Sequence, residues 1–496
     1  MKAFLATLAV GSTVGFAAAQ RVVSIGIGKT KGLPPLHKRA DPILQELHNN
    51  LTGGGYYADV SIGTPSQPVS LVLDTGSSDV WVLDSSANLC TSARLQESLG
   101  GGCIATFDPS SSSSYTALDD EPFEINYLDG SGANGTYFED NLTIGGTTIN
   151  ALQMGLATTS TINSGLMGVG YSTNVAAEDG YHNIIDMLAS QNLTAIRAYS
   201  LWLNDYASSK GTIMFGGIDT DKYIGELQAV PVIPDSDTDV YTSFTVTLSS
   251  LIVNYTDSTT FTAVQQAIPV ILDSGTTLSY LPSRIAANLY AELGAVDDTS
   301  YTGLVYIDCE YLRNESSLTF DFQFGGSDGP LVRVPVDELV LDNVKEYIDQ
   351  GLLLPELDFA DDVCSFGIQP NSGVYLLGDT FLRSAYAVYD LDNNVVALAQ
   401  ANLNSTDQNI VEITSTGIPD VSGVASQVTA AQTATGLPGA GDNTDNVPTV
   451  TVTSSPGASD SGSAGARAVP APAWEAAAVA AFAGVAGVMG VGLFVL

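Results

Sequence analysis

The sequence predicts a mostly β protein made of two duplicated lobes with an active-site cleft between them. Short apolar or alternating runs at residues 56–62, 69–73 and 80–83 are separated by turns rich in Gly, Pro, Asn and Asp. This is the pattern of strands rather than of long helices. The duplication comes from an internal repeat, because the block 71–78 (LVLDTGSS) reappears as 270–277 (VILDSGTT).

The N-terminal end has the features of two segments that are removed during maturation. Residues 1–19 have a basic start, an apolar run and small residues before Gln20, which is typical of a secretory signal peptide. Residues 20–39 are basic and end in Lys38 and Arg39, a doublet typical of sites cut by kexin-like processing proteases. We therefore expect a propeptide at 20–39.

The repeat divides the core into an N-terminal lobe at 40–219 and a C-terminal lobe at 220–403. In each lobe an apolar run enters an Asp-Thr/Ser-Gly turn and has an apolar-apolar-Gly partner, at 165–168 and at 376–378. A single Asp-Thr-Gly is most often a plain turn. Two copies with their partners in the same order indicate one site, in which the paired acids are catalytic: Asp74 and Asp273.

Two carboxylates that share one proton can hydrolyse a peptide bond without a metal or cofactor. The ionised carboxylate takes a proton from water, and the protonated one donates to the carbonyl oxygen of the substrate. Like charges held so close cannot both ionise, so the pair stays singly protonated in acid. Glycines in the turns let the backbone approach the carboxylates, and hydroxyls follow to hydrogen-bond them. These residues are Gly76, Ser77, Gly275 and Thr276.

These motifs resemble the pepsin family of aspartic proteases over most of residues 53–403. The resemblance rests on residues 55–65, on 74–78 with Trp81, on 273–276 and on 377–383. It implies a monomeric aspartic endopeptidase that acts on peptides and proteins and is inhibited by pepstatin-type compounds. It also implies that the hydroxyls of Thr75 and Ser274 cross-link the two active-site loops. Ser274 departs from the family's Thr but keeps the hydroxyl.

Residues 125–132 resemble the family's β-hairpin flap, which covers the bound substrate. The resemblance implies that Tyr127 hydrogen-bonds Trp81 and forms a wall of the cleft, with Asp129, Gly130 and Ser131 at the tip. Position 128 departs from the family's common Gly. Asp129 has two interpretations: a carboxylate that pairs with a Lys or Arg of the substrate, or an ordinary turn aspartate.

Four cysteines are present, and none forms the Cys-x-x-Cys pair of zinc or thioredoxin-type sites. In an exported chain they predict two disulfides with three possible connectivities. Sequential pairing is the simplest, because each bridge then stays within one lobe: Cys90 with Cys103, and Cys309 with Cys364. Export also makes the Asn-x-Ser/Thr sites candidate N-glycosylation sites, namely Asn50, Asn134, Asn141, Asn192, Asn254, Asn314 and Asn404.

The C-terminal end resembles a surface-anchoring signal. Residues 404–475 are rich in Ser, Thr, Gly and Pro and predict a stalk that does not fold. Residues 476–496 carry no charge, which is typical of the tail of a GPI-attachment signal. Small residues that suit the attachment are Ser461, Gly462, Ser463 and Gly465. Together with the dibasic propeptide, the tail resembles the fungal yapsin-like branch, at the outer face of the plasma membrane or in the cell wall.

The composition is strongly acidic, with 16 Lys+Arg against 54 Asp+Glu and a net charge of −38. Such a chain repels nucleic acid and suits an acidic medium.

The alternative function is a catalytically inactive cell-surface binding protein of the same fold, but the paired acids and the flap tyrosine are intact. A glycosidase would not explain the repeat. A serine or metalloprotease is excluded by the absence of a His-Glu-x-x-His motif and by the presence of only three histidines.

Overall fold

The computed structural model describes residues 21–29, 55–98, 102–127, 130–206, 208, 210–255, 258–313, 318–349, 354–359 and 362–426. Several sequence predictions therefore lie outside the described residues: the signal peptide, Lys38 and Arg39, Asn50, Asp129, Asn314, most of the stalk and the GPI signal. Among the described residues, no helix combines the length and the apolar character that crossing a bilayer requires.

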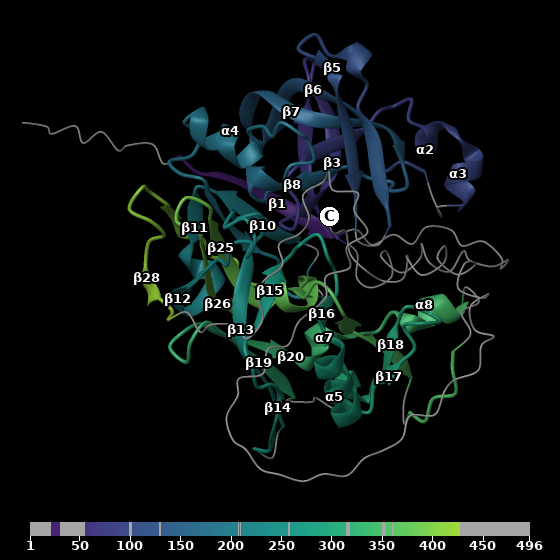
Figure 1. Cartoon of the computed structure of the whole chain (residues 1–496), viewed down its shortest axis with the longest axis vertical. Coiled ribbons are helices and arrows are strands. Elements are labelled where there is room, and N and C mark those ends of the chain that lie inside the picture. Colours follow the sequence, from purple (N-terminus) through teal and green to yellow (C-terminus); the bar gives the residue numbers. More distant parts are fainter. Residues whose placement is uncertain are drawn as a thin grey trace, which may run out of the picture.

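The N-terminal lobe, at the top of Figure 1, is built from seven strands. They are β2 (Tyr56–Ile62), β3 (Gln67–Asp74), β4 (Val80–Leu83), β5 (Thr116–Asn126), β6 (Gly132–Ile144), β7 (Thr147–Ser160) and β8 (Leu166–Gly168). Three α-helices accompany them: α2 (Asn88–Thr91), α3 (Ala93–Ser98) and α4 (Ile184–Ser190). Short 3-10 turns lie at Pro109–Ser111 and Ser172–Asn174.

The C-terminal lobe, in the lower part of Figure 1, contains an eight-stranded and a four-stranded sheet. The first comprises β13 (Thr245–Asn254), β14 (Thr260–Val264), β15 (Ile268–Leu272), β16 (Ser279–Pro282), β19 (Thr319–Phe324), β20 (Leu331–Pro335), β23 (Ile368–Asn371) and β24 (Leu376–Leu377). The second comprises β17 (Val296–Asp297), β18 (Val305–Asp308), β21 (Val340–Leu341) and β22 (Val363–Phe366). The helices are α5 (Ser283–Leu293), α6 (Glu310–Arg313), α7 (Val336–Leu339), α8 (Val344–Asp349) and α9 (Asp379–Leu382).

A central group of strands joins the two lobes. It contains β1 (Val23–Lys29), β9 (Ala198–Trp202), β10 (Lys210–Phe215), β12 (Tyr223–Pro231), β25 (Ala385–Asp390), β26 (Val395–Ala401) and β28 (Val421–Val424). These strands continue into the N-terminal lobe as one 14-stranded sheet in the order β28-β12-β26-β25-β9-β10-β1-β2-β3-β8-β4-β7-β6-β5. A separate pair is formed by β11 (Gly217–Asp219) and β27 (Ile410–Glu412), and a 3-10 turn, Thr220–Lys222, follows β11.

The predicted duplication is confirmed by the strand pairing. In the N-terminal lobe β3 runs parallel to β8, with Asp74 opposite Gly168, and β8 also pairs antiparallel with β4. In the C-terminal lobe β15 runs parallel to β24, with Leu272 opposite Leu377, and β24 pairs antiparallel with β16. The two Asp-Thr/Ser-Gly turns therefore leave equivalent strands of equivalent sheets.

The strand β1 lies within the segment predicted to be a propeptide. It pairs with β10 on one side and with β2 on the other, and its Val23 and Ile27 are buried. In the full-length chain this segment is thus part of the central sheet. Cleavage after Arg39 would break the covalent link between β1 and the strands that follow it.

The fold continues past the boundary predicted at residue 403. Strand β27 pairs with β11, and β28 runs parallel to β12 at the edge of the large sheet. Ile413 is fully buried in a cluster that includes Trp202 and Leu227. The prediction that the chain from residue 404 does not fold is therefore wrong for residues 404–426, because scattered apolar side chains in this stretch cover the central strands.

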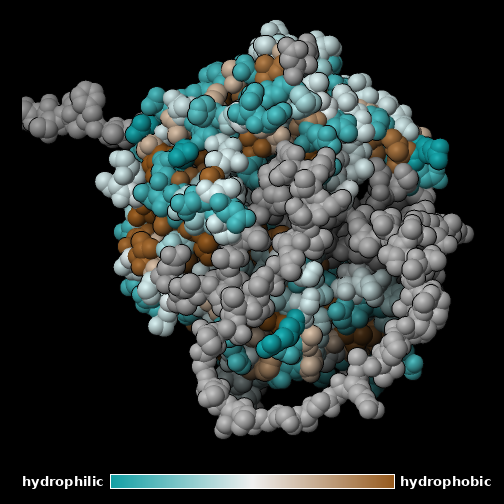
Figure 2. Space-filling model, in the orientation of Figure 1, coloured by the Kyte–Doolittle hydropathy of each residue, from teal (hydrophilic) through white to brown (hydrophobic). Residues whose placement is uncertain are grey.

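Outside the grey residues, the surface in the view of Figure 2 is mainly teal and white, that is hydrophilic or neutral. A hydrophobic area appears on the left, where Figure 1 places β12 and β28. The exposed large apolar side chains of these two strands are Ile224 and Val424.

Candidate active site

The two repeated turns place a buried carboxylate at the end of an apolar strand in each lobe. Asp74 and Asp273 are both 0% exposed. The Gly76 amide donates a hydrogen bond to Asp74 Oδ1 at 2.8 Å, and the Ser77 hydroxyl donates to Asp74 Oδ2 at 2.5 Å. In the other lobe Asp273 receives the same two bonds at the same distances from Gly275 and Thr276, so the geometry is duplicated.

The glycines of the two turns bring the carboxylates together. A Cβ atom added to Gly76 would lie 2.7 Å from Oδ1 of Asp273, the acid of the opposite lobe. A Cβ on Gly275 would in turn collide with Oδ1 of Asp74. Each turn therefore approaches the opposite carboxylate so closely that only glycine fits.

Hydroxyls of the neighbouring residues cross-link the two turns. The Thr75 hydroxyl donates to the Leu272 carbonyl at 2.9 Å and accepts a hydrogen bond from the Ser274 amide, also at 2.9 Å. Reciprocally, the Ser274 hydroxyl donates to the Leu73 carbonyl at 3.0 Å and accepts from the Thr75 amide at 3.3 Å. Four buried bonds thus fix one turn against the other, and the serine at 274 supplies the hydroxyl that they require.

Burial controls the protonation of the pair. It raises the pKa of Asp74 well above the usual carboxyl value, and the charge of Asp273 raises it further, while Ser77 and Gly76 oppose both effects. Burial also raises the pKa of Asp273, against hydrogen bonds from Thr276 and others. A hydrogen bond between the two carboxyl groups raises the pKa of Asp74 and lowers that of Asp273. Such a pair retains a proton at pH values where an ordinary aspartate is ionised.

Strands β5 and β6 form the hairpin that was predicted to be the flap. Asn126 pairs with Gly132 at its end, the Tyr127 amide donates to the Ser131 carbonyl at 2.8 Å, and the Gly130 amide donates to the Tyr127 carbonyl at 2.9 Å. Gly130 has a φ of 79°, a conformation that glycine adopts without strain.

The tyrosine of this hairpin is fixed to the first lobe. Tyr127 is 1% exposed, and the indole Nε1 of Trp81 donates a hydrogen bond to its hydroxyl at 2.8 Å. The structure thus brings Tyr127, Gly130 and Ser131 together at the hairpin tip and connects Tyr127 to Trp81 of β4, the strand that follows the Asp74 turn.

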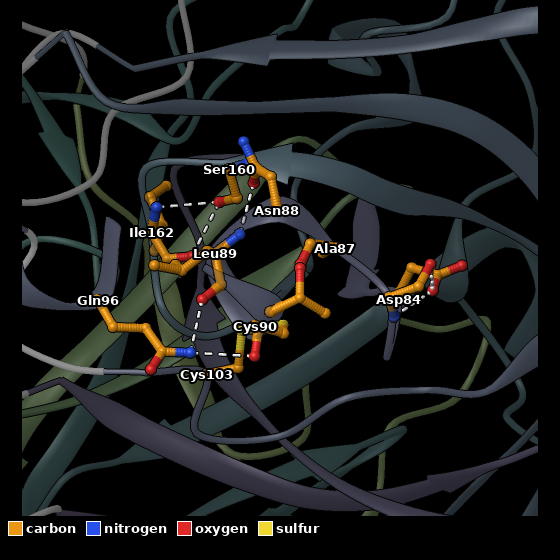
Figure 3. The surroundings of a disulfide bond; sticks show 11 residues. Asp84, Ala87, Asn88, Leu89, Cys90, Gln96, Cys103, Ser160 and Ile162 are labelled. Atoms are coloured by element: carbon orange, nitrogen blue, oxygen red, sulfur yellow. Dashed lines mark hydrogen bonds between the residues drawn. A yellow bond between two sulfur atoms is a disulfide. The ribbon is translucent and has the colours of Figure 1, made fainter. Parts of the chain in front are cut away.

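Both disulfides predicted by sequential pairing are present. Cys90–Cys103 closes the loop that contains α2 and α3, and Cys309–Cys364 connects the end of β18 to β22. Figure 3 shows the first bridge, beside which the Gln96 amide nitrogen donates to the Leu89 and Cys90 carbonyls, each at 3.0 Å. Among the described residues, the single metal-suited cluster is Cys309, Asp342 and Cys364, and both of its cysteines are disulfide-bonded.

The candidate glycosylation sites differ in their surroundings. Asn134, Asn192 and Asn404 are exposed, but the amide nitrogen of Asn404 donates to Asp205. Asn141 and Asn254 are partly buried. Asn134 lies on β6, the returning strand of the hairpin that carries Tyr127.

Sequence reasoning missed one buried acid near the pair. Asp79 follows Asp74 on the same turn and is 0% exposed, although it is not part of either repeated motif. Burial raises the pKa of Asp79, and hydrogen bonds from Tyr181, Ala176 and Tyr137 oppose that shift. The available signal was an aspartate directly before the apolar run at 80–83.

A second buried group that the sequence did not indicate is an ion pair in the C-terminal lobe. Arg383, after α9, is 1% exposed and contacts the carboxylate of Glu338 on α7, which is 3% exposed. The Arg383 guanidinium also donates to the Glu338 carbonyl at 2.8 Å. This pair connects two helices of the lobe and does not contact the carboxylates.

Comparisons with known proteins agree with this geometry. Residues 55–401 match the family model of eukaryotic aspartyl proteases. A probable aspartic-type endopeptidase OPSB of Trichophyton verrucosum is 40% identical over 84% of this chain and 85% of its own length, and the opsB protein of Aspergillus oryzae is 37% identical over 90% of each. Secreted aspartic protease 8 of Candida albicans is 34% identical over 71% of this chain and 78% of its own length. An aspartic proteinase structure from Irpex lacteus superposes with a TM-score of 0.56 at 20% identity, covering 78% of this chain and all of that one.

Proposed function

Because this chain belongs to the eukaryotic aspartyl protease family, we propose that it is an acid endopeptidase in which Asp74 and Asp273 activate a water molecule. The observation that carries this proposal is the pair of buried carboxylates, each of which accepts hydrogen bonds from a glycine amide and from a hydroxyl. Each carboxylate also lies directly against the glycine of the opposite turn. The alternative of an inactive binding protein has no structural feature in its favour, since none of these groups is replaced.

The geometry supports a mechanism by general acid–base catalysis. The ionised carboxylate removes a proton from water as the oxygen attacks the peptide carbonyl carbon, and the protonated carboxyl donates its proton to the carbonyl oxygen. Collapse of the tetrahedral intermediate then breaks the C–N bond, and a proton passes to the leaving amine. Ser77 and Thr276 hold the outer oxygens, so that the inner oxygens remain available for the water.

The flap hairpin supplies the second requirement, a covered site. Tyr127 is held by Trp81, so closure of the hairpin over a bound peptide would exclude bulk water from the carboxylates. In the sequence, residues 128 and 129 stand between Tyr127 and Gly130. We propose that Asp129 pairs with a basic side chain of the substrate before the scissile bond. An Asp129→Ala variant that keeps the same ratio of kcat/KM for Lys against Leu substrates would rule this out.

We propose that the enzyme is exported as a zymogen and anchored outside the cell. The signal-like residues 1–19, the doublet Lys38-Arg39 and the apolar segment 476–496 support this proposal. The curated relatives include a protein named as a secreted aspartic protease. A kexin-like protease would release the propeptide, and the GPI anchor would hold the enzyme at the plasma membrane or pass it to the wall, as in the yapsin-like branch.

The anchor and the processing site are tested separately from catalysis. Release of the enzyme from intact cells by a phosphatidylinositol-specific phospholipase C would support the anchor. Activity that stays in the membrane of cells stripped of their wall, after complete digestion of other GPI proteins, would contradict it. A variant with both basic residues of the doublet at 38–39 changed to Ala is expected to accumulate as a larger, inactive precursor.

The catalytic proposal is tested with pepstatin. Cleavage of a denatured protein at acid pH, stopped by a pepstatin-type inhibitor and insensitive to metal chelators, is the expected result. Folded, correctly processed protein that binds pepstatin but cleaves no denatured substrate at any acid pH would favour the inactive binding protein.

A further inference from the structure

A third carboxylate, Asp79, is buried five residues after Asp74 and has no role in the acid–base chemistry. Its side chain is fully buried, and no ion pair found in the described part of the chain includes it. Its main chain is tied to the catalytic support, since the Asp79 carbonyl accepts a hydrogen bond from the Gly168 amide at 2.9 Å. A buried carboxylate without a cation is stable only when hydrogen-bond donors surround it.

Three donors from separate segments meet this carboxylate. The Tyr137 hydroxyl donates to Oδ1 at 2.8 Å, and the Tyr181 hydroxyl donates to the same atom at 2.7 Å. The Ala176 amide donates to Oδ2 at 2.7 Å. Tyr137 lies on β6 of the flap hairpin, whereas Ala176 and Tyr181 lie in the segment before α4. The carboxylate therefore joins the catalytic turn to two other parts of the lobe.

The contact to the flap continues through aromatic rings. Tyr137 packs edge-on against Phe123 of β5, with ring centroids 5.3 Å apart, and Phe123 lies 6.1 Å from Trp81. Trp81 donates the hydrogen bond that holds Tyr127. A continuous path thus runs from the carboxylate to the tyrosine at the flap tip, through side chains of one buried cluster.

We propose that Asp79 is a positioning residue for proteolysis, whose carboxylate sets the place of the flap hairpin and of the segment 175–181 relative to the catalytic turn. This inference rests on the proposed function, since it assigns the residue to the same reaction. Asp79 touches neither the reacting atoms nor the carboxylate pair through its side chain. It acts through Tyr137, Phe123 and Trp81 on the position of Tyr127.

The donor set explains why a carboxylate is required. Both hydroxyls use Oδ1 and the amide uses Oδ2, so both oxygens must accept. An asparagine offers one accepting oxygen. If it faced the tyrosines, its NH₂ group would face the Ala176 amide, donor against donor. If it were turned over, its NH₂ group could donate to the two hydroxyl oxygens, but neither hydroxyl proton would then have the carboxylate as its acceptor. In either orientation an Asp79→Asn variant loses at least one of the three charge-assisted hydrogen bonds and weakens the hold on the attached segments.

The test compares Asp79→Asn, Tyr137→Phe and Tyr181→Phe with a matched control, Tyr290→Phe. Tyr290 is a buried tyrosine of α5 whose hydroxyl donates one hydrogen bond, to the Ile368 carbonyl at 2.9 Å, in the other lobe. The Tyr290→Phe substitution removes one buried hydrogen bond, as the substitutions at Tyr137 and Tyr181 do, but in a lobe that does not contain the flap. The tyrosine variants keep the carboxylate, so they remain informative if Asp79→Asn fails to fold.

Two readouts are measured on the processed enzyme: kcat and KM for a peptide that spans the cleft, and amide hydrogen exchange of residues 123–137. We expect kcat/KM to fall about 10-fold in Asp79→Asn and several-fold in Tyr137→Phe and in Tyr181→Phe, with faster exchange in the hairpin. The Tyr290→Phe control should stay within twofold of wild type on both readouts.

The proposal would be overturned if the control lost as much as the Asp79 and Tyr137 variants. It would also be overturned if the variants at Asp79 and Tyr137 matched wild type in both readouts. If the wild-type enzyme shows no acid proteolysis, the proposed function is refuted. Faster hairpin exchange in Asp79→Asn would in that case still support the positioning role of Asp79.

Discussion

Replacement of Thr75 by Val tests whether the hydroxyl cross-link holds the two active-site turns together. Valine has nearly the shape of threonine but removes a hydroxyl that makes two buried bonds, to the Leu272 carbonyl and from the Ser274 amide. Both backbone groups would then be buried without a partner. Since each orphaned group costs about 1–3 kcal/mol, the free energy of unfolding should fall by roughly 2–6 kcal/mol.

The catalytic effect should be large as well, because the same bonds set the distance between the carboxylates. A displacement on the order of 1 Å costs about 100-fold in rate, and we expect a loss of kcat of that size for Thr75→Val. The Thr75→Ser variant keeps the hydroxyl and serves as the matched control, with stability expected within about 1 kcal/mol of wild type.

Unfolding is followed by far-UV circular dichroism in urea, in an Asp74→Asn background that prevents self-digestion. Activity is measured in the native background. If Thr75→Val and Thr75→Ser had the same urea midpoint and the same kcat, the reasoning from the cross-link would be refuted.

Three further predictions follow from single contacts. Gly76→Ala places a Cβ 2.7 Å from Oδ1 of Asp273 and should lower kcat by about 100-fold, whereas Gly373→Ala, which meets nothing closer than 3.9 Å, should leave peptide hydrolysis unchanged. Because the pKa of Asp74 is raised in the folded protein, protonation of Asp74 stabilises the folded state. This stabilisation is fully present below the pKa of an unfolded aspartate and is lost as the pH rises through the pKa of the folded state. Asp74→Asn should therefore lose less thermal stability than wild type between pH 4 and pH 7, and an equal loss in calorimetry would contradict the assignment. Ile413→Asp buries a charge under the central strands and should lower the free energy of unfolding, measured in urea, by about 3 kcal/mol or more, whereas Val424→Asp, at a position that is 61% exposed, should not.

The repeat made most of the site predictable from the sequence. Each Asp-Thr/Ser-Gly turn is a local unit, in which strand, carboxylate, glycine and hydroxyl lie within a few residues. Their hydrogen bonds to Asp74 and to Asp273 are accordingly formed within each turn. The symmetry of the two units then implied that they meet, and the structure shows the contact between Gly76 and Asp273.

What the sequence did not reveal depends on partners far along the chain. Asp79 gains its role from Tyr137 and Tyr181, and no local pattern connects these residues. The segment 404–426 has the overall composition of a stalk, and its few apolar residues matter only because strands β11 and β12 are there to be covered. Strand β1 has an alternating apolar pattern of its own, at Val23, Ile25 and Ile27, but only its partners β10 and β2 show that it belongs to the central sheet.

The central claim is that Asp74 and Asp273 act as one catalytic pair. The most direct measurement is cleavage of a denatured protein at acid pH by the processed enzyme and by Asp74→Asn and Asp273→Asn, each shown to be folded by circular dichroism. The account predicts pepstatin-sensitive cleavage by the wild type and a loss of kcat of at least about 10³-fold in either variant. A folded Asp74→Asn or Asp273→Asn enzyme that cleaves at a rate near that of the wild type would contradict it.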